Sequence, residues 1–320
     1  MTTSGTTTFT ETRDQLITNA LTLLQVVAAG ETVQAADLTY CASALNAMVK
    51  AWMAQGIHLW TEEEGTIYLV NGQTTYTLPG ANGSDGSGTP IETSLSATVT
   101  SGTTIQVTTS TGMAISDNIG IVLDNNTILW TTITNIVSTT ITLNTSITSS
   151  ATSGNLVFTY TTSLSRPLSI QSARLRNANS FDKMMEIKPR FDYMNIPQKN
   201  ITGSPIILYY TPQLSTGVVY VWPTPQNVSE RLKITYLRTL QDFNSGSDNP
   251  DLPQEWLEAI TYNLAVRVAP AYGLNLSSGG INGNPDILRQ AAQYLDDLKA
   301  WDSEQPYIQV VPKFRSGNGK

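Results

Sequence analysis

Residues 252–273 read LPQEWLEAITYNLAVRVAPAYG, and this stretch predicts a helix near the end of the chain. Pro253 stands where a proline is tolerated in a first turn, and Glu255 and Glu258 suit the positive helix N-terminus. Apolar residues then recur at helical spacing, namely Leu257, Ile260, Leu264 and Val268. Pro270 ends the pattern, so we expect an amphipathic helix that packs one apolar stripe on a core.

Two helices are predicted at the start of the chain, within residues 12–56. Thr12 and Gln15 form a capping-box pattern, and Gly30 and Gly56 follow the first and the second helix. The expected apolar faces are Leu16, Ala20, Leu23 and Val27, and then Leu38, Cys41, Leu45, Met48 and Trp52. Because Cys41 lies within such a face, we expect a buried and unreactive thiol.

A fourth helix is expected from Asp286 to about Trp301. Its apolar face would be Ile287, Leu288, Ala291, Tyr294, Leu295 and Leu298. Helices at both ends of a chain can share a core. We therefore predict an α+β protein in which residues 1–64 and 251–301 pack as a helical bundle.

Between the helices, hydrophobicity alternates with period two and predicts an antiparallel β core in residues 65–80 and 164–250. The alternating positions are Ile67, Leu69, Tyr76 and Leu78, then Ile206, Leu208 and Tyr210, then Val219 and Val221, and finally Leu232, Ile234 and Tyr236. Pro223 and Pro225 follow the third group and should end its strand.

Residues 81–163 differ in composition from their surroundings. They follow the linker-like sequence GANGSDGSGTP, which begins at Gly80, and they are rich in Thr and Ser. Short alternating segments in this range predict a small all-β, sandwich-like module. TTIQVTTS from Thr103 and TTITLNTS from Thr139 echo one another, which either a duplicated hairpin or Thr-rich strand composition explains.

Cysteine and histidine counts restrict the chemistry of the chain. With Cys41 and His58 as the single residues of their types, no internal disulfide framework and none of the usual zinc or iron sites can form. An all-oxygen calcium site stays open, but we expect no metal and no cofactor. The N-terminus has neither the basic start nor the apolar segment of a signal peptide, so we expect synthesis in the cytoplasm and no membrane contact.

The charge of the chain argues against a groove that grips DNA. The net charge is -7 and the pI is near 4.7, whereas phosphate binding requires clustered Lys and Arg. Between Lys50 and Arg166 there is no Lys or Arg at all. That third of the chain carries only acidic, amide and hydroxyl groups on its polar surface.

Candidates for catalysis are few. Glu62, Glu63 and Glu64 are the nearest approach to a carboxylate cluster, but neighbours in sequence do not face each other across a cleft, and we expect a solvated turn. A Ser-His-Asp set would depend on His58, and no nucleophile elbow or Walker pattern accompanies it. We therefore expect no enzyme.

Several stretches together resemble the head-to-tail adaptor family of short-tailed phages, the tail accessory proteins that stabilise packaged DNA. These are residues 252–273, the helical pair from Thr12 to Trp60, and then Arg166-Pro167, GSPIILYYTP at 203–212 and VVYVWPTPQ at 218–226. They cover both ends and the middle third of the chain. Because matching segments lie on both sides of residues 81–163, the resemblance implies that the module is an insertion whose two ends lie close together.

The resemblance implies a structural role at the head-tail junction of a virion. Copies would form a ring, of twelve by analogy with the portal, that links the portal protein to the tail nozzle and continues the DNA channel used in packaging and ejection. Double-stranded DNA would pass without sequence-specific binding. The segment without basic residues is consistent with a channel wall that repels phosphate, and equally with a polar surface in solvent.

The last segment, residues 302–320, is apolar, basic and punctuated by proline. By resemblance it would dock in the portal ring, and the candidate portal-binding residues are Tyr307, Ile308, Val310, Val311, Lys313, Phe314 and Arg315. The alternative is that they fold back on their own subunit. Exposed in a free tail, these side chains would favour aggregation, so one of the two is expected.

Two further interpretations stay open. Tyr209, Tyr210, Tyr220 and Trp222 suggest base stacking, but without interleaved Lys or Arg they are more typical of a core or a subunit interface. The inserted module would either brace the particle or bind a neighbouring tail part or a host surface. In the second case the protein is a receptor- or carbohydrate-binding tail protein.

Overall fold

The computed structural model describes residues 3–55, 61–79, 86–88, 90–276 and 286–301. The chain divides into two compact units, one drawn from residues 1–60 and 240–320 and the other from residues 61–239. It is an α+β protein with more strand than helix, which confirms the predicted class. No helix among the described residues combines the length and apolar composition that a membrane span requires.

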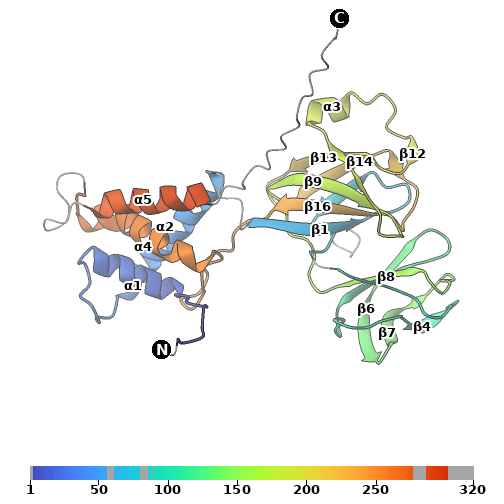
Figure 1. Ribbon diagram of the computed structural model, residues 1–320, viewed down its shortest axis with the longest axis horizontal. Coiled ribbons are helices and arrows are strands. Elements are labelled where there is room, and N and C mark those ends of the chain that lie inside the picture. The colour runs from blue at the N-terminus through green and yellow to red at the C-terminus, as the bar shows by residue number, and fades with distance from the viewer. Residues whose placement is uncertain (1–2, 56–60, 80–85, 89, 277–285, 302–320) are drawn as a thin grey trace, which may run out of the picture. The chain divides into compact units, whose positions relative to one another are not determined.

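The first unit is helical and contains segments from both ends of the sequence (Figure 1). Its helices are α1 (Arg13–Leu23), α2 (Ala35–Ala54), α4 (Leu257–Val268) and α5 (Ile287–Trp301), with 3-10 turns η2 (Gln254–Trp256) and η3 (Ala269–Tyr272) flanking α4. One apolar core includes side chains from all of these helices. The ends of the chain thus fold against each other, as the spacing of their apolar residues predicts.

Local signals explain where the helices begin and end. The capping box at Thr12 and Gln15 is formed, and it starts α1. The helix stops at Leu23, well before Gly30, because Gln25 takes a left-handed conformation with φ of 59°. In α4 the four apolar positions of the predicted stripe are all buried, and Gly273 ends the following turn with φ of 72°.

A regular helical bundle, as predicted, is not supported. The helices do not pack evenly around a common axis: α4 packs on each of the other three helices, whereas α5 packs mainly on α4. Leu288 was also assigned wrongly to the apolar face of α5, since its side chain is exposed. Ile287 and Ala291 alone in that helix are deeply buried among the described side chains.

The β core of the second unit consists of two four-stranded sheets that enclose one apolar cluster. The first has the order β1 (Glu62–Tyr68), β16 (Arg231–Leu237), β9 (Ser169–Arg176) and β10 (Asp182–Met184). The second has the order β11 (Glu186–Ile187), β13 (Ile207–Pro212), β14 (Gly217–Trp222) and β2 (Thr75–Leu78). The short helix α3 (Arg190–Met194) packs on β13, and β12 (Thr202–Gly203) pairs with β15 (Thr224–Pro225).

Most of the predicted alternation in this core is confirmed. Ile67, Leu69, Leu208, Val219, Val221, Leu232, Ile234 and Tyr236 are all buried in the shared cluster. Ile206 is an exception, because it precedes β13 and is exposed. The antiparallel arrangement also has exceptions, since β11 pairs with β13 in parallel, as β12 does with β15.

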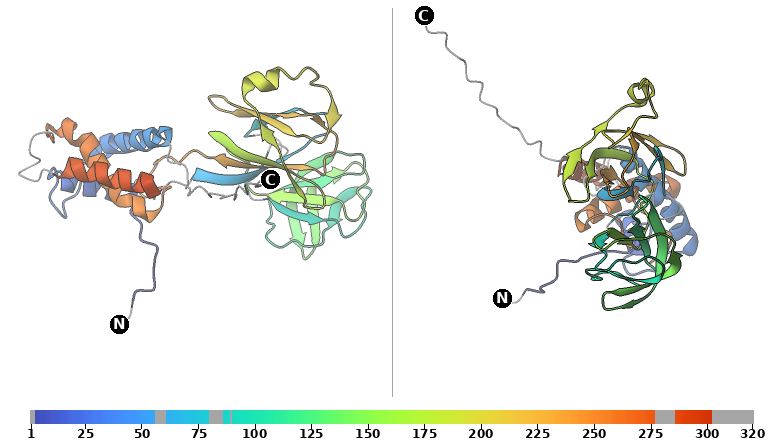
Figure 2. Two further views of the ribbon diagram at one scale, coloured as in Figure 1. Left: turned by 45° about the horizontal axis from the view of Figure 1, so that its top comes forward. Right: turned by 90° about the vertical axis from the view of Figure 1, so that its right-hand side faces the viewer.

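Residues 90–162 form a separate β module on their own apolar cluster. Its single six-stranded antiparallel sheet has the order β3 (Ile91–Ser94), β8 (Leu156–Tyr160), β5 (Asn118–Val122), β6 (Ile128–Val137), β7 (Thr140–Ile147) and β4 (Gly102–Gln106). The sheet curls into a half barrel, visible in green in Figure 2, and a bridge between Leu95 and Val107 joins its two edges. The predicted sandwich is therefore wrong, because one curled sheet encloses the core by itself.

The two Thr-rich segments that echo one another are neighbours inside the module. They form β4 and β7, which pair directly with one another, with Ile105 opposite Ile141. Both isoleucines are buried, whereas the polar residues beside them are exposed or partly exposed. This pairing is compatible with a duplicated hairpin and with Thr-rich strand composition.

The ends of the module lie next to each other, as predicted for an insertion. Ser87 forms bridges with both Thr66 of β1 and Ser163, so the entering and leaving chains meet at the edge of the β core. Leu164 then enters the core cluster, where its side chain lies against Gly65.

Candidate functional site

The predicted portal-binding residues, Tyr307, Ile308, Val310, Val311, Lys313, Phe314 and Arg315, lie outside the described residues, and so does His58. Cys41 is buried, as expected, with its sulfur 3.7 Å from the hydroxyl of Tyr272. Burial is the main reason why the pKa of this thiol is raised, which keeps it protonated and weakly nucleophilic.

The expectation of a solvated turn at residues 62–64 is wrong. All three acids belong to β1, which pairs with β16 from Glu62 onwards. Glu63 accepts a hydrogen bond of 2.7 Å from Arg238, and Glu64 forms an ion pair with Arg174. Because strand side chains alternate between faces, consecutive carboxylates diverge, and Glu63 and Glu64 find different partners, Arg238 just after β16 and Arg174 on β9. Glu63 and Glu64 therefore form ion pairs that stabilise the sheet.

The tyrosines of the β core form a stack rather than an open platform. Tyr209 of β13 and Tyr220 of β14 lie opposite one another in the sheet, with ring centroids 5.5 Å apart. Tyr193 of α3 stacks on Tyr209 at 5.4 Å and completes the group. Tyr193 and Tyr209 are both buried, which favours the core interpretation over base stacking.

Lys199 fixes the segment that follows α3. Its ammonium lies 4.3 Å from the centroid of the Tyr193 ring and donates hydrogen bonds to the carbonyls of Tyr193 and Ile196. The carbonyl of Tyr193 belongs to the last turn of α3, where backbone acceptors have no partner within the helix, and that of Ile196 lies just beyond the helix. The cation thus serves as a cap, and its donors are largely occupied.

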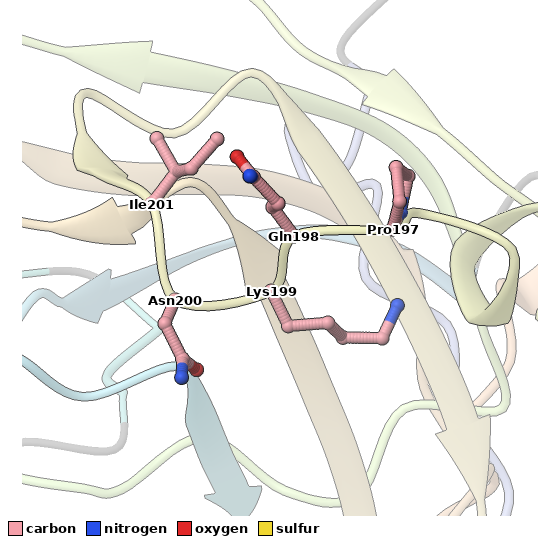
Figure 3. Close-up of a pocket in the computed structure, with 5 residues that line it drawn as sticks. All are labelled: Pro197, Gln198, Lys199, Asn200 and Ile201. Carbon is pink, nitrogen blue, oxygen red and sulfur yellow. The ribbon is translucent and has the colours of Figure 1, made fainter.

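An open hollow of about 590 Å³ lies along residues 197–201. Figure 3 shows Gln198 and Ile201 on one side of this loop and Lys199 and Asn200 on the other. A second hollow of about 230 Å³ is lined by Lys199 and Asn200 together with Tyr193 and Tyr220. The side chains offer aromatic edges and amide groups, which suit contact with another molecule more than a chemical reaction.

A buried ion cluster joins the module to the β core. Glu92 of β3 accepts hydrogen bonds from Arg231 at 2.7 Å and from Lys233 at 2.9 Å, both on β16. The side chains of Arg231 and Lys233 are 1% and 11% exposed, and that of Glu92 is 22% exposed. Lys233 also donates to the hydroxyl of Thr66 on β1 at 2.9 Å. The module and two strands of the core therefore share one ionic network.

The protonation of this network follows from its surroundings. Burial alone would raise the pKa of Glu92, but the hydrogen bond and charge of Lys233, with the charge of Arg231, outweigh it and lower that pKa. Burial also lowers the pKa of Lys233, against the opposing effect of Glu92. A buried carboxylate held between two cations stays ionised at neutral pH.

Aromatic packing surrounds the ion cluster. Tyr68 of β1 lies 4.8 Å from Trp130 and 4.9 Å from Phe158, measured between ring centroids, and its hydroxyl is 3.1 Å from that of Ser87. Val228 from the chain before β16 completes this junction cluster. Asn126, at the turn between β5 and β6, adds hydrogen bonds to Gln226 and Val228. The module is therefore fixed to the core by apolar, ionic and hydrogen-bonded contacts.

Sequence patterns missed the ion cluster, although one signal for it was present. Arg231 and Lys233 stand two residues apart in a strand, which places both on one face. Glu92 is the acid within the first strand of a segment that has no bases of its own. A cationic face and an acidic strand that lack local partners indicate a pair across a domain junction.

Within the described ranges, no three His, Cys, Asp or Glu side chains are placed to share a metal ion. Neither the known protein families nor the curated proteins include a match to this chain.

Proposed function

We propose that this chain is a structural connector of a phage virion, and not an enzyme, which forms a ring beneath the portal, links it to the tail nozzle and continues the DNA channel. One observation carries the proposal. The helical segments that resemble the adaptor family stand at opposite ends of the sequence, yet α1, α2 and α4 share one apolar core. The separate segments that resemble the adaptor family therefore pack together in the folded chain.

The charged side chains of the second unit, residues 61–239, support a structural role. Glu63 and Glu64 are held by arginines, and the ammonium of Lys199 caps α3, so these groups serve the fold. In the module, Glu92 is paired with two cations and Asp117 is buried. Asp124 is the remaining acid of residues 90–162, and it is exposed. The module has no Lys or Arg, so its polar surface consists of hydroxyl and amide groups with this carboxylate, which suits a wall that does not retain phosphate.

The location of the chain in the particle tests the proposal. Gold labels directed against this chain, viewed by electron microscopy on intact and tail-stripped particles, should mark the junction below the portal in both. Label confined to peripheral fibres or spikes would rule out the connector function and favour the receptor-binding alternative.

A shortened module separates the two functions in another way. Replacement of residues 89–161 by a short Gly-Ser linker retains the meeting point of Ser87 and Ser163. If the module binds a host surface, particles carrying this variant would assemble but fail to attach. If the module braces the junction, we expect tailless or leaking heads.

Portal docking is assigned to residues 302–320, on the resemblance stated for the tail. A chain that ends at Trp301 should lose binding to purified portal rings while it retains the helical signal of the intact chain. Substitution of Lys313 and Arg315 alone by Ala tests the charged contribution. Unchanged portal binding by the truncated chain would place the contact elsewhere.

A further inference from the structure

Large apolar side chains are exposed together along residues 181–194. Phe181, Met184, Phe191 and Met194 are 69%, 72%, 75% and 48% exposed. Single exposed apolar residues need no explanation, whereas several within a short span mark an interaction surface. Phenylalanine and methionine are also the residue types enriched where proteins meet.

These side chains stand on fixed elements. Asp182 of β10 receives hydrogen bonds of 2.7 and 2.8 Å from Arg176 of β9, which holds the hairpin that carries Phe181 and Met184. α3, which carries Phe191, is held through its buried Tyr193. Seven residues of chain span at most about 25 Å, so one partner can reach both elements.

The same surface is positively charged. Residues 166–199 contain seven Lys and Arg against three acids. Asp182 and Glu186 are paired with Arg176 and Lys188, whereas no ion pair involves the exposed Lys183 and Arg190 within the described residues. The third acid, Asp192 of α3, is also exposed, and the two cations outnumber it. We define the α3–β10 surface as Phe181, Lys183, Met184, Arg190, Phe191 and Met194. Its charge and its apolar side chains fit an acidic partner with aromatic groups.

The chain itself contains a surface of that kind. Tyr262 of α4 and Tyr294 of α5 meet edge to face, with ring centroids 5.2 Å apart. Glu258 lies one turn before Tyr262 and Asp297 one turn after Tyr294, so the two carboxylates flank the tyrosine pair. Both acids are exposed, and no ion pair involves either of them in the described part of the chain. We call these four residues the α4–α5 face.

We propose that the α3–β10 surface of one copy binds the α4–α5 face of a second copy. We choose a second copy as the partner because the two surfaces carry opposite charges, and because each has aromatic or apolar side chains at its centre. A contact between two different surfaces repeats from copy to copy and generates a ring where the rotation closes. This inference rests on the proposed connector function, and it specifies the two surfaces through which the subunits of the ring would bind each other.

Charge reversal on each surface tests the contact in the purified full chain. Lys183→Glu with Arg190→Glu makes both surfaces of a copy negative, and Glu258→Lys with Asp297→Lys makes both positive. In sedimentation velocity over rising concentration, the unaltered chain should self-associate, and each double variant alone should do so more than about ten-fold more weakly. An equimolar mixture of the two variants should recover association, because opposite surfaces then face each other.

The recovery in the mixture also shows that both variants fold. Arg267→Glu is the matched control, since it lies about two and a half turns from Glu258 on α4 and points away from the face. The proposal is overturned if the unaltered chain stays monomeric at every concentration, if the double variants associate normally, or if the mixture fails to recover. Association as expected, with the gold label on fibres, would keep the contact and remove the connector.

Discussion

Glu92 is the carboxylate on which the junction between module and core depends. Glu92→Gln leaves Arg231 and Lys233 without a countercharge in a largely buried site. Loss of one partner of a buried pair is costly, so we expect the free energy of unfolding to fall by about 3 kcal/mol, measured by urea unfolding. Glu186→Gln, which breaks the exposed pair with Lys188, is the control and should cost less than about 1 kcal/mol. Equal losses would contradict the role given to burial.

The same carboxylate gives the junction a pH dependence. Because Lys233 and Arg231 hold its pKa below the ordinary value despite burial, its contribution is complete above about pH 4.3 and is lost as pH falls through the lowered pKa. The stability difference between the unaltered chain and Glu92→Gln should therefore shrink between pH 5 and pH 3. A difference that stays constant over this range would show that ionisation of Glu92 does not stabilise the fold.

Gly120 of β5 allows the indole of Trp130 to approach the backbone closely. A Cβ atom at this position would be 2.6 Å from two ring carbons, so Gly120→Ala must displace a tryptophan of the junction cluster. We expect a loss of about 1 to 3 kcal/mol, measured by thermal unfolding with a change in tryptophan fluorescence. Gly88→Ala is the control, because nothing lies within 4 Å of its added Cβ. Equal stability of the Gly120 variant would show that the ring can move freely.

At the scale of elements, periodic patterns predicted the buried faces of helices and strands. The apolar stripe of α4 and the alternation of β16 were correct, because a buried face imposes its period on the sequence. The end of α1 was not, because the sequence carries no glycine or other signal for the left-handed conformation at Gln25. The strand at Glu62 was not, because the pairing of β1 with β16 is a contact between distant segments. The candidate site was harder still, because Glu92 and Arg231 are 139 residues apart and neither residue type marks a site alone.

Because the cluster inside the β core has no member from the insertion, we expect this core to fold without it. Leu232, Ile234 and the other members of the core cluster come from outside residues 89–161. Replacement of that range by a Gly-Ser linker should therefore leave a folded core, but with Tyr68 and Val228 newly exposed. Adding Tyr68→Ser should restore solubility, and circular dichroism with hydrogen exchange in β16 measures the result. Loss of protection throughout β16 would show that the core needs the module to fold.

For the whole molecule, the two compact units predict two unfolding transitions. Leu264 is buried in the helical core and Leu232 in the β core, and the two clusters have no member in common. A leucine-to-alanine change in either core costs about 2 to 5 kcal/mol, so each should lower one calorimetric transition by several degrees. We expect Leu264→Ala to shift one peak and Leu232→Ala the other. Since the helical core joins segments from both ends of the chain, a fragment of residues 61–239 should keep the second peak and lack the first. A single peak that moves equally with both substitutions would mean that the two units fold as one cooperative body.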